Sequence, residues 1–552
     1  MSLHGCVPPA WARNGKVAAL LLCFLICVAC GDVYRPTIIP NPVPIPPPQN
    51  FHTAFVVNQN GTVNPGTGMQ VDVSGDSNAG TTKVAMNPVH ATVLGSSLWV
   101  ANNGSDSVSV FAEALGTTGS IGSSTDINLI KGSSPVFVAS TDASTMYVAN
   151  SGQLKDQNTG TPYYAVDAIL NATAPSTAVI AEIRLPPCNP PSQPLTPWAL
   201  AETPDKKKLY VVNKDCNNVT VINTVDKTVN TTLSAGTSPR WVLARSDSTR
   251  VYVLANDGTL TTIDTTQAVD QVVSSIPVGA GSDSFYYDSH LNRLYIPNPT
   301  NSTVSIYDVT ADPPSLIATI NLTQPPASGG NPPCPATGCF PLSVAPLPDG
   351  SRAYVASYYI DSTSANCIQT PCVQPQLTAI NTLNNQVMTV ITIPEASVSS
   401  VGNCASLRFR ISAAASADST RVYLASCDAG GVAGVRTSDN SYVVTLNAPV
   451  SGYSPPAVNI TSATQSGSST TYTYTMISGI PLILGMPISI TGIANPGDTK
   501  LNPDNGTFTV TGLGAGFFTV TNPQGVPTTV AQTAFGLGQP PPQNPAFMVA
   551  GP

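Results

Sequence analysis

The sequence predicts an all-β fold, and three observations carry that prediction. Only 9% of the 552 residues are charged, which argues against a coiled coil, a disordered polyelectrolyte and a nucleic-acid binder, since all three need dense charge. Short segments of alternating apolar and polar residues recur between polar turns, as in half-buried strands. A four-residue phrase also repeats along most of the chain at a nearly fixed interval.

The repeated phrase consists of an aromatic residue, two mostly apolar residues and a small polar residue. Its aromatic anchors are Phe55, Trp99, Tyr147, Tyr210, Tyr252, Tyr295, Tyr354 and Tyr423, at spacings of 44, 48, 63, 42, 43, 59 and 69 residues. A base period of 42 to 44 residues with insertions is the length of a four-stranded β-propeller blade. Eight anchors suggest eight blades. The Phe55 copy lacks a clear leading strand, however, so seven blades with terminal strands shared in a closing blade remain the alternative.

The period resembles that of the YVTN-repeat β-propeller family. Residues 239–279, with Tyr252-Val253-Leu254-Ala255-Asn256 and Ile263-Asp264-Thr265, match its pattern well, and the resemblance covers roughly residues 51–450. It implies the propeller fold and leaves the function open. Members of this class occur as envelope and surface-layer proteins, and similar propellers include lactonases and redox-enzyme subunits.

The N-terminus predicts export. Arg13 and Lys16 precede an apolar run at 17–29, which is too short to span a bilayer and has the length of a signal-peptide core. The run ends in a segment that resembles the bacterial lipobox: Ala29 and Gly31 fit, although Cys27 stands where Leu is usual. We therefore expect a lipoprotein signal peptide at 1–29, then a lipidated Cys30 and a Pro-rich tether at 30–50. An ordinary secretory signal cut near Ala29, with Cys30 left as a thiol, is the alternative.

The composition changes after residue 450. From Gly452 onward the charged residues are Asp498, Lys500 and Asp504, there is no cysteine, and strand-like runs are broken by Gly and Pro. This pattern is similar to a small β-barrel module that recurs in phage tail proteins and as an insertion in ubiquitin-activating enzymes, although only the strand pattern carries over. We expect the propeller at 51–450, a small all-β sandwich or barrel domain at 451–538 and a Pro-rich tail at 539–552.

Eight cysteines follow the leader and Cys30, and an even number in an exported chain predicts disulfides. They are Cys188, Cys216, Cys334, Cys339, Cys367, Cys372, Cys404 and Cys427. Their phase relative to the anchors predicts Cys188 with Cys216 and Cys404 with Cys427, because each pair lies in loops on one face of a blade. The other four would form two bridges of open connectivity. Their rival role is a four-cysteine zinc site, which C-x4-C spacing in an oxidising envelope disfavours, so we expect no metal.

Catalytic motifs are missing from the sequence, and the mature chain has only His52, His90 and His290. Geometry supplies a candidate binding site instead, since first strands line a propeller's central channel and residues near their starts should converge on one mouth. These residues are His90, Phe137, Trp198, Arg240, Trp241, Phe285 and Arg408. Their aromatic rings and arginines suit a carboxylate, a phosphate or a sugar. Alternatively, the rings fill space between blades and Arg240 pairs with an acid.

These observations favour binding over catalysis. We expect a monomeric, non-catalytic cell-envelope lipoprotein without a cofactor, whose propeller is a binding or scaffolding surface for an envelope protein, a glycan or a surface polymer. Its anchor would hold it in a membrane, the outer membrane or cell surface rather than the inner membrane, and we expect no nucleic-acid partner. A lactonase-like hydrolase or a redox-enzyme-associated subunit is the alternative. It would need a histidine with a carboxylate in the channel mouth, where the sequence offers His90 without an obvious partner.

Overall fold

The computed structural model describes residues 53–551 apart from several segments. The omitted segments are 60–64, 113–121, 142–143, 171–178, 192, 327–328, 330, 362–371, 394–409, 428–429, 447–456, 479–481, 483–486, 492, 494–502, 526–535 and 540–543. The expected signal peptide, the tether and Cys30 therefore lie outside the described residues.

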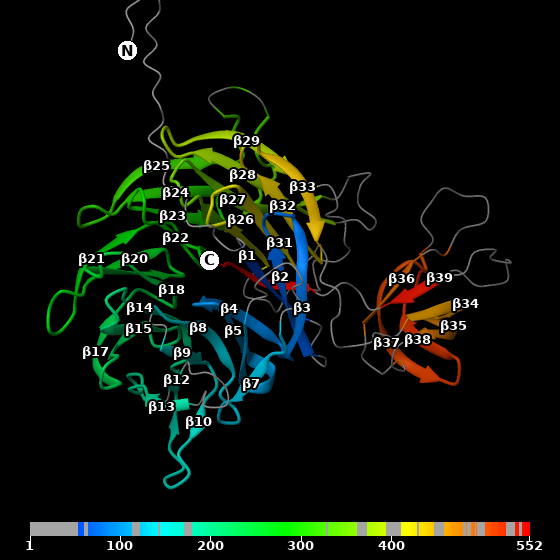
Figure 1. Ribbon diagram of the computed structural model, residues 1–552, viewed down its shortest axis with the longest axis horizontal. Coiled ribbons are helices and arrows are strands. Elements are labelled where there is room, and N and C mark those ends of the chain that lie inside the picture. The colour runs from blue at the N-terminus through cyan, green and yellow to red at the C-terminus, as the bar shows by residue number, and fades with distance from the viewer. Residues whose placement is uncertain are drawn as a thin grey trace, which may run out of the picture. The chain divides into compact units, whose positions relative to one another are not determined.

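The described residues form a β-propeller of eight four-stranded antiparallel sheets. Figure 1 shows the blades arranged around a common centre, with first strands such as β8, β18 and β26 close to it and outer strands such as β17, β21 and β29 at the periphery. The structure has eight blades, and this number decides between the seven and the eight blades that the sequence left open.

The blades are numbered in chain order, and seven of them are continuous in sequence apart from a hairpin inserted in blade 3. Blades 2 to 4 contain β4 (Pro88–Leu94), β5 (Ser97–Asn102), β6 (Ser107–Ala112) and β7 (Thr125–Asn128); β8 (Pro135–Ala139), β9 (Thr145–Asn150), β12 (Ala165–Leu170) and β13 (Val179–Arg184); and β14 (Pro197–Glu202), β15 (Lys208–Asn213), β16 (Asn218–Asn223) and β17 (Thr228–Ser234). The inserted hairpin is β10 (Leu154–Lys155) and β11 (Pro162–Tyr163), and a short 3-10 turn, η1 (Asn103–Ser105), joins β5 to β6.

Blades 5 to 8 follow the same order from the centre outward. They contain β18 (Pro239–Ala244), β19 (Arg250–Ala255), β20 (Thr259–Asp264) and β21 (Gln271–Pro277); β22 (Tyr286–Asp288), β23 (Arg293–Asn298), β24 (Thr303–Asp308) and β25 (Ser315–Asn321); β26 (Phe340–Pro346), β27 (Arg352–Asp361), β28 (Cys372–Asn381) and β29 (Gln386–Thr392); and β30 (Ile411–Ala415), β31 (Arg421–Ser426), β32 (Gly431–Arg436) and β33 (Ser441–Leu446).

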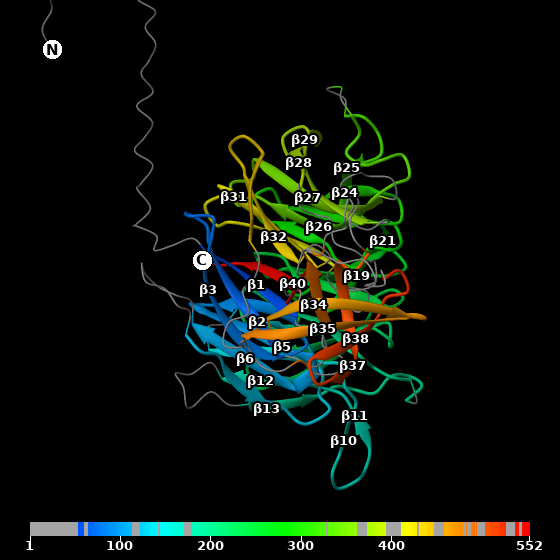
Figure 2. The ribbon, with the colours of Figure 1, turned by 90° about the vertical axis from the view of Figure 1, so that its right-hand side faces the viewer.

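Blade 1 joins the two ends of the described chain. It consists of β1 (Thr53–Gln59), β2 (Pro65–Asp72), β3 (Ser77–Met86) and the final strand β40 (Asn544–Ala550), which pairs antiparallel with β1 (Figure 2). The prediction of a Pro-rich tail at 539–552 was therefore wrong for residues 544–550. These residues supply the missing first strand, and Met548 is buried in the core beside Val56.

The chain between β33 and β40 forms a closed six-stranded barrel. Its strands, in spatial order, are β34 (Ala457–Ser466), β35 (Ser469–Ser478), β38 (Phe517–Thr521), β37 (Gly506–Gly514), β36 (Pro487–Thr491) and β39 (Gly536–Gln539). Tyr472, Ile490, Phe518 and Val520 fill its core. The small all-β domain is thus present, as an insertion before the last propeller strand.

The repeated phrase forms the second strand of each blade. Its two recurring features, the aromatic anchor and the small polar residue, both have structural roles. All eight aromatic anchors are at most 2% exposed. The buried asparagines that end four of the phrases donate their side-chain amides to the third strand of the same blade. These bonds join Asn58 to Thr67, Asn102 to Ser109, Asn150 to Asp167 and Asn213 to Thr220.

In blades 4 to 8, a cationic side chain two residues before the aromatic anchor bonds to the next blade. We call this contact the clasp. Lys208, Arg250, Arg293, Arg352 and Arg421 each reach the turn between the third and fourth strands of the following blade. Arg421 of blade 8 donates two charge-assisted hydrogen bonds of 2.8 Å to Asp76 of blade 1, and the Tyr423 hydroxyl donates to the same carboxylate at 2.9 Å. Both side chains of the ion pair are mostly buried, at 16% and 12% exposed.

We expect Arg421→Gln to lower the free energy of unfolding by about 3 kcal/mol, because it leaves the buried Asp76 carboxylate without its guanidinium partner. Arg436→Gln is the matched control, since Arg436 and Asp439 are about half exposed and such pairs contribute at most about 1 kcal/mol. The midpoint of urea unfolding, followed by tryptophan fluorescence, measures both. Trp99, Trp198 and Trp241 all lie in propeller strands. Equal midpoints for the two variants would show that the clasp does not hold the joint.

Candidate functional site

A β-bulge at the start of the first strands determines which side chains of these strands join the central ring and which lie at the mouth of the propeller. The ladder between first and second strands shifts register just after the leading proline in blades 2, 3, 4, 5 and 7, at Pro88, Pro135, Pro197, Pro239 and Pro341. A bulge inserts one extra residue and re-aims its side chain. Each of these strands therefore has a bulge position directly after the proline and a ring position one residue later.

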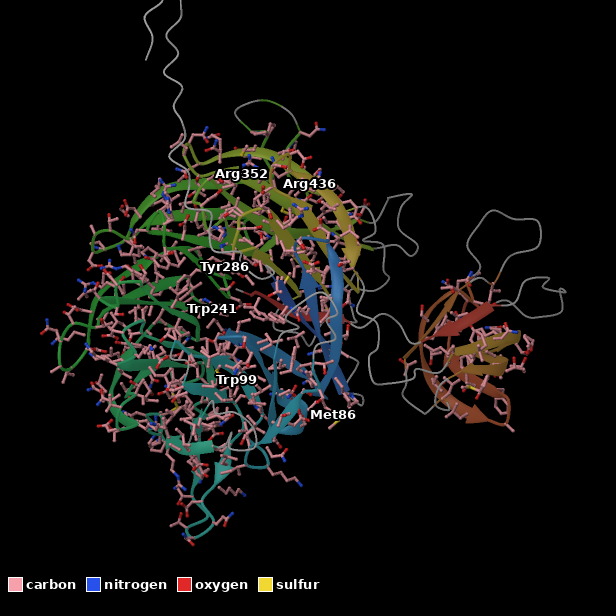
Figure 3. The ribbon with its side chains drawn as sticks, in the orientation of Figure 1. Met86, Trp99, Trp241, Tyr286, Arg352 and Arg436 are labelled. Atoms are coloured by element: carbon pink, nitrogen blue, oxygen red, sulfur yellow. A yellow bond between two sulfur atoms is a disulfide. The ribbon has the colours of Figure 1, made fainter. Side chains whose placement is uncertain are left out.

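The ring position lies opposite the second-strand residue two places after the aromatic anchor. In blades 1 to 5 it is occupied by Phe547, His90, Phe137, Ala199 and Trp241, and in blades 7 and 8 by Ser343 and Ser412. One side of the ring is thus mainly aromatic and the other carries hydroxyls. Figure 3 shows Trp241 near the centre of the propeller, where the first strands meet.

The aromatic side of the ring forms a continuous row. The His90 ring stacks on Phe137 at a centroid separation of 3.7 Å and contacts Phe547 at 4.4 Å, and Phe137 meets Trp241 edge-on at 5.5 Å. Phe137 and Trp241 belong to blades 3 and 5, so the contact passes Ala199 of blade 4, whose small side chain leaves the space. The structure brings His90, Phe137 and Trp241 together, as the sequence suggested, but as packed rings inside the channel.

Trp198 and Arg240 occupy the bulge positions of blades 4 and 5 and form a separate cluster. The Lys214 ammonium lies 4.8 Å from the centroid of the Trp198 ring, and the Arg240 guanidinium lies 5.6 Å from it, both within cation–π range. Arg240 Nε is 3.9 Å from a carboxylate oxygen of Asp283, which is 60% exposed. We call Trp198, Lys214, Arg240 and Asp283 the mouth cluster.

A disulfide joins the loop that leads into β14, the strand of Trp198, to the loop after β15, which carries Lys214. Cys188 and Cys216 are bonded, with 5.5 Å between their Cα atoms, which confirms the predicted pair. The loop before β14 and the loop after β15 are further joined by backbone hydrogen bonds from Lys214 to Thr196 and from Asp215 to Leu195. Lys214 is therefore held next to Trp198 by covalent and hydrogen-bonded links, which limits the entropy lost when a ligand binds.

The remaining predicted bridges have mixed outcomes. Cys334 bonds to Cys339. This disulfide is incompatible with a zinc site that uses the thiolates of all four cysteines of blade 7. Cys427 is disulfide-bonded, and Cys404, Cys367 and the Cys372 side chain lie outside the described residues. Among the described residues, no group of three or more His, Cys, Asp or Glu side chains is placed to hold a metal ion.

One predicted mouth residue stands apart from the mouth cluster. Phe285 is fully buried in the core between blades 5 and 6, beside Tyr252 and Leu294, so its interpretation as a mouth residue was wrong. It precedes the short strand β22, where the blade has no leading proline to mark the phase. Arg408 lies outside the described residues.

Sequence reasoning missed several residues of this face. Lys214 follows the phrase of blade 4 and lies two residues before Cys216, so the phasing that placed the cysteine on the rim also locates the lysine. A second aromatic–cation cluster forms at blades 7 and 8. There Phe340 stacks on Tyr358 at 4.9 Å and the Arg410 guanidinium lies 4.9 Å from the Tyr358 ring. Phe547 was missed because it belongs to the segment interpreted as a tail.

Two buried titratable groups, one in blade 2 and one in blade 3, have structural surroundings. His90 is 5% exposed, and the backbone N–H of Val138 lies 3.4 Å from its Nδ1. Asp167 of β12 is 3% exposed and accepts a 2.8 Å hydrogen bond from Asn150. Burial raises the pKa of Asp167 to about 6; the hydrogen bond from Asn150 opposes this shift and the charge of Glu182 adds to it. Neither group is open to a substrate at the mouth.

Comparisons with known proteins give fold likenesses only. No protein-family model and no curated protein match the sequence. Citrobacter koseri AztD is 11% identical, with a TM-score of 0.48, over 72% of this chain and 94% of that one. Pseudomonas aeruginosa periplasmic gluconolactonase PpgL is 14% identical, with a TM-score of 0.42, over 62% and 95%. A Bacteroides fragilis protein described as a putative 6-phosphogluconolactonase is 13% identical, with a TM-score of 0.43, over 62% and 94%.

The described ranges contain no helix with the length and apolar composition that a membrane span requires.

The raised pKa of Asp167 predicts a pH dependence of stability. The folded state keeps the proton up to about pH 6, whereas the unfolded carboxyl loses it near pH 4, so unfolding releases a proton between these values. The free energy of unfolding should fall by about 3 kcal/mol as the pH rises through this window. Asp167→Asn should flatten this part of the profile, measured by urea unfolding at pH 4 to 7. Asp226→Asn, at an exposed turn, is the control, and an unchanged slope in Asp167→Asn would refute the assignment.

Proposed function

We propose that the protein is an exported, lipid-anchored binding protein related to the YVTN-repeat propellers, and that its propeller mouth takes an anionic glycan. The observation that carries the proposal is the mouth cluster, in which one half-buried indole is contacted by Lys214, on a disulfide-braced loop, and by Arg240, at the start of β18. Aromatic faces stack on sugar rings, and guanidinium and ammonium groups bind carboxylates, so the cluster offers both kinds of contact to a uronic acid chain.

The electrostatics of the mouth cluster favour an incoming anion. The Arg240–Asp283 contact is long, and Asp283 is mostly exposed, so water already weakens this pair. The Arg240 side chain is 22% exposed, and a ligand carboxylate would compete with Asp283 for it. The second cluster, around Arg410 and Tyr358, lies at the same end of the first strands and adds a cation and an exposed ring, that of Phe340.

Binding is favoured over catalysis because the one channel histidine is packed. His90 lies between two aromatic rings at 3.7 and 4.4 Å and is nearly inaccessible, so it is poorly placed to exchange protons with a substrate. A lactonase-like hydrolysis would need such an exchange at the mouth. The packed aromatic row behind the mouth cluster also supports a ligand held at the surface of the propeller.

We expect polygalacturonate to bind the full chain and Arg240→Gln and Trp198→Ala each to weaken the binding about tenfold, through loss of a charge-assisted contact and of a stacking face. Lys227→Gln is the matched control. It removes the same charge from the turn between β16 and β17, on the opposite face of blade 4. Isothermal titration at two salt concentrations measures the affinities, and higher salt should weaken wild-type binding. If Arg240→Gln and Lys227→Gln lowered the affinity equally, the propeller mouth would be refuted as the glycan-binding site.

The anchor is tested separately by intact mass. Protein extracted from membranes should begin at Cys30 and carry acyl chains, and Cys30→Ala should release it from the membrane fraction. The eight following cysteines should resist alkylation until they are reduced. An unlipidated wild-type product that starts near Cys30 would contradict the anchor and support an ordinary secretory signal.

A further inference from the structure

One outer face of the barrel carries many hydroxyl groups. On β34, β35, β38 and β37 the side chains alternate, so that Tyr472, Phe518 and Val520 point into the core and their neighbours point outward. The outward residues are Thr461, Ser462, Thr464, Thr471, Thr473, Thr509, Thr511, Thr519 and Thr521, all exposed or half-exposed. We call these residues the hydroxyl face.

Strand pairing aligns the hydroxyl face into rows across the barrel. Thr464 pairs with Thr471, and Thr471 pairs with Thr519, whose hydroxyl lies 3.4 Å from that of Thr511. In the next row Ser462 pairs with Thr473, which also shares a 2.8 Å hydrogen bond with Thr461. Neighbouring strands are about 4.8 Å apart, so the rows present hydroxyl groups, each able to donate and to accept a hydrogen bond, at intervals on the scale of a sugar ring.

An aromatic platform continues the second row. Phe517 pairs with Thr473 on one side and with Gly514 on the other, and it is 39% exposed. A Cβ atom on Gly514 would come within 2.1 Å of the Phe517 ring, so the ring lies across the bare backbone of β37. Because Gly514 has no side chain, the ring can pack on this backbone, and its partial exposure leaves part of the ring open to solvent beside the paired Thr473.

The charge of this surface narrows the choice of partner. In the described part of the barrel the one charged residue is Asp504, which is fully buried and accepts a hydrogen bond from Tyr472. An anionic or cationic polymer would lose hydration here without gaining an ion pair.

We propose that the hydroxyl face and Phe517 bind an uncharged polysaccharide, with a sugar ring stacked on Phe517 and its hydroxyls bonded to Thr473, Thr471 and Thr519. This site is independent of the propeller mouth. It differs from the mouth in charge, and it lies across neighbouring strands of the barrel. Such a surface suits an extended chain of repeating units, because hydroxyl groups recur in both rows at the spacing of the strands.

Affinity electrophoresis of the full chain tests the proposal. Native gels contain hydroxyethylcellulose, laminarin, galactomannan or dextran, and a parallel gel contains polygalacturonate. At least one neutral polymer should retard the wild type, Phe517→Ala should raise the dissociation constant about tenfold or more, and Phe517→Tyr should retain binding. Thr473→Val and Thr519→Val, which keep the side-chain shape, should each weaken binding severalfold.

Leu513→Ala is the matched control, since Leu513 is as exposed as Phe517, at 38%, but pairs with the core residue Phe518. It should be retarded like the wild type, and far-ultraviolet circular dichroism verifies that each variant is folded. No retardation by any neutral polymer, or equal retardation of Phe517→Ala and the wild type, would overturn the proposal. The polygalacturonate gel reports on the mouth, so the two proposals can fail separately.

Discussion

The pairing of β40 with β1 is the constraint on which the rest of the propeller depends. A ring of blades must join its two ends, and here the last described strand completes the blade that the first strands begin. The barrel is inserted just before this closing strand, which is possible because its first and last strands, β34 and β39, pair with each other. The chain therefore enters and leaves the barrel on neighbouring strands. The Arg421–Asp76 clasp adds a buried ion pair at the same joint, between blade 8 and blade 1.

Blade-to-blade contact relies on a polar device as well as on the apolar core. Blades 4 to 8 each direct a cation from the start of the second strand into the outer turn of the next blade, where it meets carbonyl and carboxylate oxygens. The buried anchor tyrosine of the same strand bonds to the same turn in several blades, as Tyr354 does with Asn440. The anchor tyrosines that make these bonds thus also link neighbouring blades.

The sequence predicted the propeller because the second strand of every blade carries the same local signal. It predicted Cys188–Cys216 because the phase of that signal places both loops on one face. Residues 544–550 were missed because they pair with residues nearly 500 positions away and prolines dominate the segment before them, so no local pattern marks a strand. Arg240 and Trp241 were grouped together, whereas the bulge after Pro239 sends one to the mouth and the other to the ring. A bulge changes the phase of a strand by one residue, and periodicity alone does not locate it.

The ring explains why ligand chemistry is expected at the surface of the propeller. Phe547, His90, Phe137 and Trp241 come from four blades and form one packed row, which includes the closing strand. Their mutual contact depends on Ala199, because a larger side chain there would separate Trp241 from Phe137. The same bulges that place these rings in one row place Trp198 and Arg240 at the other side of the strand, so one backbone irregularity builds both the aromatic row and the charged mouth. The rings pack blade against blade, whereas the bulge residues Trp198 and Arg240 form the proposed binding site.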